Sequence, residues 1–286
     1  MVNDKKYFSF VRSYSFDATC SFLLLKNQYK NMRYNFVNYK YEPFDNLMSN
    51  KTVENIDEVF FVGIAPNHID KLNEFKSSVV LCNQEHYIHL RDKNKNRFIV
   101  TNISITKLTN KYLQHITQKS NKKLNEFVDV VEDNVLGKYK FSKSIHLNWL
   151  FWHLGGEMFL KRFDKFDFNF TEQEKSILAN KTQEFKTNFN ALRVDKISDN
   201  ACLIATDKFL EETCFLSLKK HGYKHVFCFV PERKRVYIRS RDRDIDLGEL
   251  VRQFSDAGGI KYAASFGIKN SDELFDKTFL LSRLLK

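Results

Sequence analysis

The stretch VFFVGI at residues 59–64 decides the fold class. A continuous run of apolar and small residues indicates a strand buried on both faces, which is typical of a parallel sheet covered by helices. A second run, SVVLC at residues 78–82, has the same character. Residues 67–75 between them are predicted to form a helix that begins at Asn67. Strand, helix and strand in this order predict a right-handed crossover in a parallel sheet.

The same alternation extends on both sides of this unit. Further strands are predicted at 7–11, 33–39 and 98–103, and helices at 16–29, 121–136, 145–159 and 171–190. In the last third, strands are predicted at 201–205, 225–230, 235–240 and 263–267, and helices at 208–220, 247–254 and 271–285, the last capped by Ser271. We therefore predict an α/β protein with a parallel-sheet domain at 1–170, a helical linker at 171–192 and a smaller α/β domain at 193–286.

The composition is that of a globular protein with a basic balance. Its 286 residues include 46 Lys and Arg against 35 Asp and Glu, which gives a net charge of +11. Such a charge suits nucleic acid, anionic lipid or an acidic protein partner. The abundance of Lys, Asn, Phe, Tyr and Ile also matches the amino-acid bias of AT-rich genomes, so part of the lysine excess needs no functional reason.

Apolar runs, the N-terminal sequence and the cysteines indicate where the protein is expected to be located. The longest apolar run, Val59–Ala65, is far shorter than the roughly 20 residues of a membrane-spanning helix, and the N-terminus lacks the pattern of a signal peptide. Five widely spaced cysteines, without a C-x-x-C pair, argue against a disulfide framework and a zinc ribbon. We predict an intracellular protein in a reducing compartment, and a mitochondrial and a cytoplasmic location both stay open.

Several motifs appear together in one order. Near the C-terminus, VYIRSR at 236–241 precedes FSDAGGIKYAASF at 254–266, and near the N-terminus FDATCS stands at 16–21. VNY at 37–39 and VVLCNQ at 79–84 complete the set. This ordered set resembles the DHH-family phosphoesterases, which have a parallel-sheet domain and a substrate-binding domain. The resemblance covers nearly the whole chain.

The resemblance implies a chemistry whose residues are largely replaced. In the family, carboxylates and imidazoles hold two divalent metals, usually manganese, that activate water and stabilise phosphate oxygens. The matching positions here carry Arg12, Tyr14, Asp17, Gly63, Cys82, Asn83 and Gln84, with a loosely aligned acidic position near Glu132–Asn134. Asp17 alone is retained among the first seven, and the guanidinium of Arg12 would oppose a cation. We therefore predict no catalytic residues, no metal and no cofactor.

Two other interpretations of this region are less favoured by the residue pattern. His86 and His89, beside Glu85, are a candidate for a shifted metal site, although a histidine pair without paired carboxylates is more often a surface feature. Cys82 with His86 is a candidate for a nucleophile and its base, although a cysteine at the end of an apolar strand is usually inert packing.

The C-terminal motif suggests a second kind of site. By the resemblance, the nucleotide-binding candidates are Arg239, Ser240, Arg241, Gly258, Gly259 and Lys261, whereas Ala257, Ile260 and Ser265 depart from the family's glycine and histidine loop. Two basic stretches, Lys93–Asn125 and Arg233–Arg243, add charge, and their interleaved aromatic residues could stack on bases. These aromatic and imidazole residues are Phe98, Tyr112, His115 and Tyr237. The simpler interpretation of the charge is a solvated loop face.

Aromatic residues are the last unusual feature. The chain has 28 Phe, 12 Tyr and 2 Trp. Two places are predicted either to contact a partner or, for the first, to close the interface between the two domains: the segment Phe159–Phe170, and the last helix with Phe275, Phe279, Leu280 and Leu284. Trp149, Trp152 and Phe159 at helical spacing are predicted to be core rather than a ligand platform.

These observations lead to one hypothesis and two alternatives. The first is a catalytically inactive protein of this fold that serves as a structural or accessory subunit, with other protein subunits as partners. The second is a nucleotide- or nucleic-acid-binding module that uses the basic cleft around Arg239. The third is an active oligonucleotide phosphodiesterase with an atypical site.

Overall fold

The computed structural model divides the chain into two compact units, Met1–Lys175 and Ser176–Lys286. It describes residues 5–38, 55–66, 69–83, 88, 90–91, 96–100, 103–118, 121–207, 211–242, 244–254 and 256–285. In these ranges no helix is both long enough and apolar enough to cross a membrane. Gln84, Glu85, His86 and His89 lie outside the described residues.

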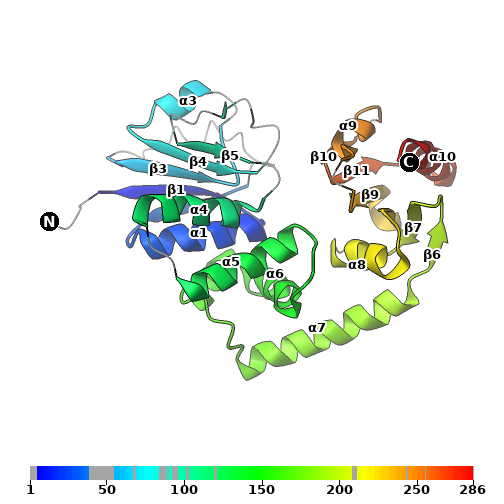
Figure 1. Cartoon of the computed structure of the whole chain (residues 1–286), viewed down its shortest axis with the longest axis horizontal. Coiled ribbons are helices and arrows are strands. Elements are labelled where there is room, and N and C mark those ends of the chain that lie inside the picture. Colours follow the sequence, from blue (N-terminus) through cyan, green and yellow to red (C-terminus); the bar gives the residue numbers. More distant parts are fainter. Residues whose placement is uncertain are drawn as a thin grey trace. The chain divides into compact units, whose positions relative to one another are not determined.

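The first unit is built on a five-stranded sheet in which every strand pair is parallel (Figure 1). Its strands are β1 (Tyr7–Arg12), β2 (Arg33–Val37), β3 (Glu58–Val62), β4 (Ser78–Cys82) and β5 (Arg97–Ile99), in the order β2-β1-β3-β4-β5. The continuous apolar runs occupy the central strands β3 and β4, where burial on both faces requires them. The predicted parallel sheet is confirmed.

Helices cover both faces of this sheet. α1 (Phe16–Gln28) and α4 (Ile105–Thr117) pack against each other on one face, and α3 (Ile69–Asn73) lies on the other (Figure 1). α5 (Lys122–Val135) and α6 (Ser142–Arg162) follow and pack on each other and on α1.

Helix α4 was not predicted from the sequence. It begins within the basic stretch Lys93–Asn125, which was interpreted as a loop face or a nucleic-acid surface, and that interpretation as a loop is wrong for residues 105–117. The apolar face of α4, with Ile105, Leu108 and Leu113, is buried, and the lysines lie around it.

The second unit holds a six-stranded mixed sheet in the order β10-β11-β9-β8-β7-β6. Its elements are α7 (Glu172–Ala191, which begins in the first unit), β6 (Val194–Lys196), β7 (Ala201–Ala205), α8 (Glu211–His221), β8 (His225–Val230), the 3₁₀ turn η4 (Pro231–Arg233), β9 (Arg235–Ser240), α9 (Leu247–Val251), β10 (Gly258–Ile260), β11 (Ala263–Gly267) and α10 (Ser271–Leu284). β7 and β8 are parallel, and the other pairs are antiparallel. The N-cap of α10 is Asn270, not Ser271, because the Asn270 side chain accepts a hydrogen bond from the Glu273 backbone N–H.

The aromatic segment Phe159–Phe170 belongs to the core of the first unit. Phe159 and Phe163 are fully buried, and Phe159 packs on Phe16 with ring centroids 6.0 Å apart. Phe166 has a positive φ of 54°, which turns the chain so that its ring meets Phe127 of α5. For Phe159, Phe163 and Phe166, the prediction that they form a partner surface is therefore wrong, because they are buried among side chains of the first unit.

The two tryptophans of α6 differ in burial. Trp149 is buried as predicted, but Trp152 is exposed. Gly155 has a φ of 73° and kinks α6 between the tryptophans and Phe159, and Phe159 is buried as predicted.

Candidate functional site

The carboxyl ends of the three central strands of the first sheet meet at one edge. Arg12 ends β1, Gly63 follows β3, and Cys82 ends β4 with Asn83 after it. Asp17 lies in the first turn of α1, which starts from the same edge. The structure therefore brings these sequence-predicted positions into one neighbourhood.

The carboxylate of Asp17 is held by the N-terminus of α4. One oxygen accepts hydrogen bonds from the backbone N–H of Thr106 at 2.9 Å and from its hydroxyl at 2.8 Å. The other accepts from the backbone N–H of Ile105 at 2.8 Å, and the side-chain amide of Asn83 lies 3.4 Å away. Asp17 thus satisfies two of the N–H groups that a helix start leaves without intrahelical partners.

A second carboxylate serves the same helix start. Glu132 of α5 accepts hydrogen bonds from the backbone N–H and the hydroxyl of Ser104, the N-cap residue of α4. Ser104 in turn accepts from the backbone N–H of Lys107. Neither α4 nor this role of Glu132 was predicted, although Ser104 before Ile105, Leu108 and Tyr112 was the available signal.

Burial dominates the electrostatics of Asp17. Its side chain is buried, and desolvation raises the pKa of the carboxyl to about 6. The hydrogen bonds from Thr106 and Ile105 lower the pKa, and the negative charge of Glu132 raises it further. The net direction shows that the helix start compensates only part of the penalty for burying the charge.

Gly63 stands where the resemblance implies a metal-binding aspartate, and the space beside it is filled. A Cβ at this position would lie 3.0 Å from Ala18 Cβ and 3.1 Å from Ile105 Cδ1. The φ of 69° also disfavours any residue with a side chain. A carboxylate cannot be placed here without moving the junction of α1 and α4.

The other positions do not supply cation ligands either. Arg12 is half-buried, and Tyr14 is highly exposed with a φ of 52°. The Cys82 side chain is buried in the apolar cluster with Ile64 and Leu90. Asn83 donates to the carbonyl of Ile103 at 3.3 Å.

A pair of divalent metals does not fit this donor set. Such metals prefer several carboxylate and imidazole ligands. Among the described residues of this edge, the carboxylates of Asp17 and Glu132 both already accept hydrogen bonds from the start of α4. Within the described ranges, no three His, Cys, Asp or Glu side chains cluster closely enough to hold a metal ion.

In the second unit, two of the nucleotide-binding candidates are built into the sheet. Arg239 is buried, and its Nη1 donates to the backbone carbonyl of Ile238 at 2.7 Å. Ser240 is fully buried, and its hydroxyl donates to the carbonyl of Asp242 and accepts from the Asp242 N–H. Both side chains therefore stabilise the end of β9.

The remaining candidates surround the β10–β11 turn. The Ser240 N–H donates to the Tyr262 carbonyl at 3.1 Å, which joins the end of β9 to the turn that contains Lys261, and Arg241 and Lys261 are both exposed. Gly259 is required by packing, because a Cβ there would lie 2.6 Å from the Ala263 carbonyl oxygen. A Cβ on Gly258 would enter open space.

The aromatic residues of the basic stretches divide by burial. Tyr112 is buried against Phe98 and Phe60, so it cannot stack on a base, which corrects its prediction. His115 is exposed on α4. Tyr237 is half-buried and accepts a hydrogen bond from Arg233 at 3.2 Å.

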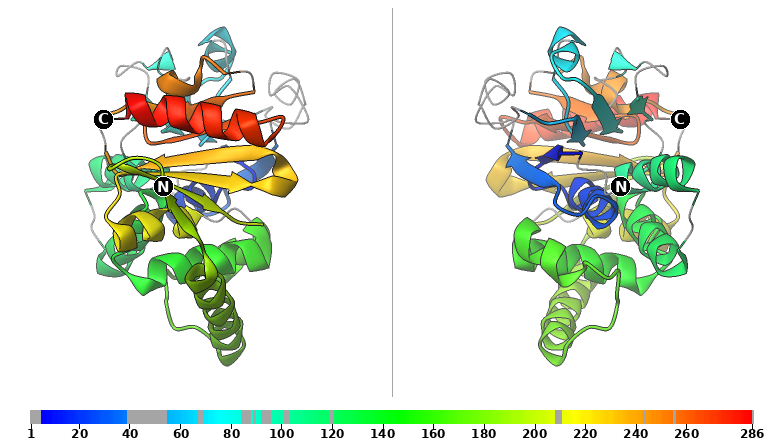
Figure 2. Two further views of the ribbon diagram at one scale, coloured as in Figure 1. Left: turned by 90° about the vertical axis from the view of Figure 1, so that its right-hand side faces the viewer. Right: turned by 90° about the vertical axis from the view of Figure 1, so that its left-hand side faces the viewer.

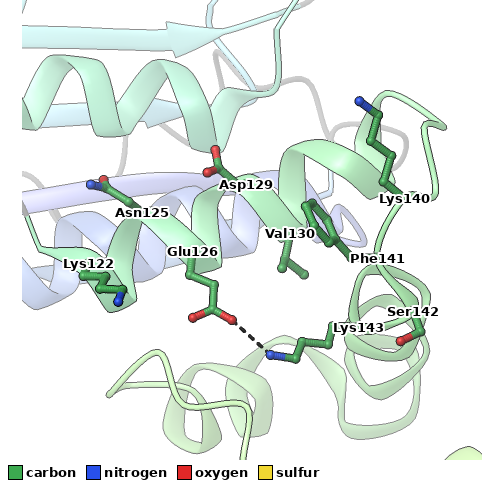
Figure 3. Close-up of a pocket in the computed structure, with 9 residues that line it drawn as sticks. All are labelled: Lys122, Asn125, Glu126, Asp129, Val130, Lys140, Phe141, Ser142 and Lys143. Atoms are coloured by element: carbon green, nitrogen blue, oxygen red, sulfur yellow. Dashed lines mark hydrogen bonds and ion pairs between the residues drawn. The ribbon is translucent and has the colours of Figure 1, made fainter.

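A cavity of about 980 Å³ lies between α5 and the start of α6 (Figure 3). Its walls carry both charges, and Lys143 and Glu126 form an ion pair across it at 3.0 Å. Asp129 on the same wall pairs with Lys107 at 2.7 Å. The sequence did not point to this cavity, and its mixed and partly paired charges do not define a ligand class.

Comparisons with known proteins agree with the architecture. A pGpG-specific phosphodiesterase from Vibrio cholerae superposes with a TM-score of 0.60 over 98% of each chain at 14% identity. An exopolyphosphatase-related protein from Bacteroides fragilis gives 0.55 over 97% of this chain and 91% of that chain at 13% identity. CDC45 from Entamoeba histolytica gives 0.45 over 97% and 95% at 10% identity.

No family model and no curated protein matches the sequence. The two superpositions with TM-scores above 0.5 establish the fold alone. The chain has the two-part α/β fold of the DHH phosphoesterases, and the fold expected from the resemblance is confirmed.

Proposed function

We propose that this chain is a non-catalytic protein with the DHH phosphoesterase fold that acts as a structural or accessory subunit of a larger protein complex. The observation that carries the proposal is the state of Asp17, the carboxylate retained at the expected metal edge. Its oxygens accept from the Ile105 and Thr106 backbone N–H groups, so it works as a helix cap.

The side chains at the sheet edge are the reason why we expect no metal-dependent hydrolysis. Two-metal phosphoester hydrolysis needs acidic ligands that hold the cations and a water between them. Gly63 cannot be given a carboxylate without a clash, and Arg12 places a positive charge on the same edge. A cation would have to displace the α4 N-terminus from Asp17 before it could bind.

A role in contacts with protein is supported by exposed apolar side chains in each unit. Trp152 and Met158 of α6 are exposed in the first unit, and Phe275 and Phe279 of α10 in the second. Large apolar side chains of this kind are enriched in the centres of protein interfaces.

A hydrolysis assay tests the absence of catalysis. The full chain is incubated with Mn²⁺ and with pGpG and polyphosphate, which follow from the names of two proteins of similar fold, and with short oligonucleotides. We expect no turnover above a metal-only control. Manganese-dependent hydrolysis that is abolished by Asp17→Ala in a folded variant would sink the proposal and favour a phosphodiesterase with an atypical site.

Isolation of the native protein tests the accessory role. The chain is purified under mild conditions after chemical crosslinking, and we expect a stable assembly above the mass of the single chain. A monodisperse monomer with no crosslinked product would contradict this part of the proposal.

A nucleotide- or nucleic-acid-binding module is the second candidate, favoured by two exposed basic residues, Arg241 after the end of β9 and Lys261 in the turn between β10 and β11. Binding of a labelled oligonucleotide should then weaken steeply between about 50 and 200 mM salt, because neutralised phosphates release counterions. Arg241→Ala should reduce the affinity and the salt slope, whereas Lys186→Ala on the exposed side of α7 should not. Binding that is insensitive to Arg241→Ala would exclude this surface.

A further inference from the structure

The exposed face of α10 has a regular pattern. Its exposed residues recur in adjacent pairs every four positions, which keeps them on one side of the helix. These residues are Phe275, Asp276, Phe279, Leu280, Arg283 and Leu284. Leu274, Thr278 and Leu281 are buried on the opposite side, against the sheet. In the left view of Figure 2, α10 lies in front of the strands of its own unit.

The exposed residues of this face are complementary to those of a second copy that runs in the antiparallel direction. Suppose that a second α10 packs antiparallel, with the twofold axis between positions 279 and 280. A residue that lies a given number of positions before the axis is then opposite the residue that lies the same number of positions after the axis in the other copy. Phe279 then faces the leucine at 280 of the other copy, and Phe275 faces the leucine at 284. Asp276 faces the arginine at 283, so each copy contributes one acid and one base.

We propose that the exposed face of α10 is the contact between two copies of this chain, packed antiparallel about a twofold axis. Aromatic rings meet leucines, and the acid near the N-terminal half meets the base near the C-terminal half, which is the self-complementarity that an isologous interface requires. Parallel packing would instead place Asp276 against Asp276 and Arg283 against Arg283.

The charged pair is well placed for this arrangement. The Arg283 guanidinium lies 4.3 Å from the centroid of Phe279, which holds the positive charge over the middle of the apolar face. Asp276 lies one turn before Leu280 on the same exposed side. Like charges placed opposite each other across an interface are strongly disfavoured, so these two residues also set the direction of packing.

The size of the face sets the strength of the dimer. Phe275, Phe279, Leu280 and Leu284 are 62%, 50%, 44% and 51% exposed. With roughly 200 Å² for each side chain, these fractions leave ~400 Å² of apolar surface on each copy. Together with the charged pair, the two copies reach the lower end of specific interfaces. We therefore expect a dissociation constant of about 1–100 μM.

The inference deepens the proposed function, because it names one contact of the proposed assembly, but it does not depend on the absence of catalysis. A hydrolase could use the same contact. Hydrolysis would overturn the proposed function and leave the dimer standing, whereas a failure of self-association would overturn the dimer and leave the non-catalytic assignment standing.

Sedimentation velocity on the full chain, from about 1 to 300 μM, tests the contact. The wild type should pass from monomer to dimer in this range. Asp276→Arg alone and Arg283→Asp alone should each raise the dissociation constant at least about tenfold, and the double variant should return close to the wild-type value. Trp152→Ala, an exposed aromatic change on α6, is the matched control and should leave the dissociation constant unchanged.

Site-directed crosslinking tests the direction of the helices. The five native cysteines are buried, so an added exposed cysteine can be modified selectively. Leu280→Cys lies beside the proposed axis and should crosslink efficiently with a short bis-maleimide. Ser271→Cys at the start of α10 should not, because at 1.5 Å per residue the two copies of position 271 are roughly 25 Å apart.

Three results would overturn the proposal. The first is a wild type that stays monomeric at every concentration. The second is a dimer that withstands both single charge reversals, or that the double variant does not restore. The third is efficient crosslinking at position 271 with none at 280.

Discussion

Replacement of Asp17 by alanine should damage the fold of the first unit rather than an activity. The substitution removes the acceptor of four hydrogen bonds, from the Ile105 N–H, the Thr106 N–H, the Thr106 hydroxyl and the Asn83 side-chain amide. The hydroxyl and the amide each keep a second acceptor, the backbone carbonyls of Asp17 at 3.0 Å and of Ile103 at 3.3 Å. The flanking side chains of Ile105 and Thr106 are buried, so water does not readily replace the lost acceptor.

Two opposing contributions decide the magnitude. A buried donor left without a partner costs about 1–3 kcal/mol, so the two backbone N–H groups cost roughly 2–6 kcal/mol, and the weakened bonding of the hydroxyl and the amide adds about 1 kcal/mol. Removal of the buried charge offsets part of this cost, because burial raises the pKa of Asp17 from 3.8 to about 6, and two pKa units correspond to about 3 kcal/mol. The cost of the unpaired donors outweighs the gain from removing the buried charge, and we expect the free energy of unfolding to fall by about 2 kcal/mol.

Urea denaturation measures this loss, and hydrogen exchange locates it. We expect faster exchange of the amides of residues 105–109 at the start of α4, because their helix has lost its cap. Asp129→Ala is the matched control, since it removes a carboxylate that also reaches α4, through an exposed ion pair with Lys107. This change should alter the free energy of unfolding by less than about 1 kcal/mol.

An unchanged free energy of unfolding in Asp17→Ala, together with unchanged exchange in α4, would refute the capping role. It would also remove the main support for the non-catalytic assignment, because a carboxylate that contributes nothing to stability is available for another task.

Three further outcomes follow from the structure. Burial lowers the pKa of His225 from 6.5 to about 4, although the charge of Asp242 acts in the opposite direction. The neutral imidazole therefore contributes stability that is present above about pH 6.5 and is lost as the pH falls through about 4. In urea titrations over this interval, the free energy of unfolding of the wild type should fall by up to about 3 kcal/mol relative to that of His225→Leu, and a constant difference would contradict the reasoning. Gly259→Ala should lower the melting temperature of the second unit by several degrees, whereas Gly258→Ala, where a Cβ meets open space, should leave it nearly unchanged in calorimetry; equal effects would contradict the packing argument. Gly63→Asp should destabilise the first unit without creating a manganese site, and a calorimetric titration that showed tight Mn²⁺ binding by a stable variant would contradict the account of this edge.

The elements with strong local patterns were predictable from the sequence. Strands β7, β8, β9 and β11 begin and end at the predicted residues, because continuous apolar or alternating runs are bounded by turn residues. The short strands β6 and β10 were not predicted, since three residues carry too little pattern and their assignment depends on pairing with a neighbour. α4 was missed because lysines and polar residues interrupt its apolar face in the linear sequence.

The location of the candidate site was predictable, but its internal arrangement was not. Parallel strands end at a common edge, so Arg12, Gly63 and Asn83 could be expected to come together. The partner of Asp17 lies 88 residues further along the chain, in a helix that the sequence did not reveal. Arg239 presented the same difficulty, because its register in the sheet decides that the guanidinium is buried.

The arrangement at the sheet edge explains how buried acidic residues are stabilised there without a bound metal ion. Asp17 lies in the first turn of α1 and accepts from the first turn of α4, so the positive ends of two helices meet at its carboxylate. Glu132 adds a second negative charge at the same helix start. Helix N-termini provide partial positive charge and free N–H donors, which is part of what a cation would otherwise supply. The pKa of Asp17 nevertheless stays raised, because the desolvation of the buried carboxyl outweighs the hydrogen bonds from Ile105 and Thr106. A metal could therefore gain from the charge of Asp17 only by uncapping α4, and the stability lost in doing so opposes metal binding at this edge.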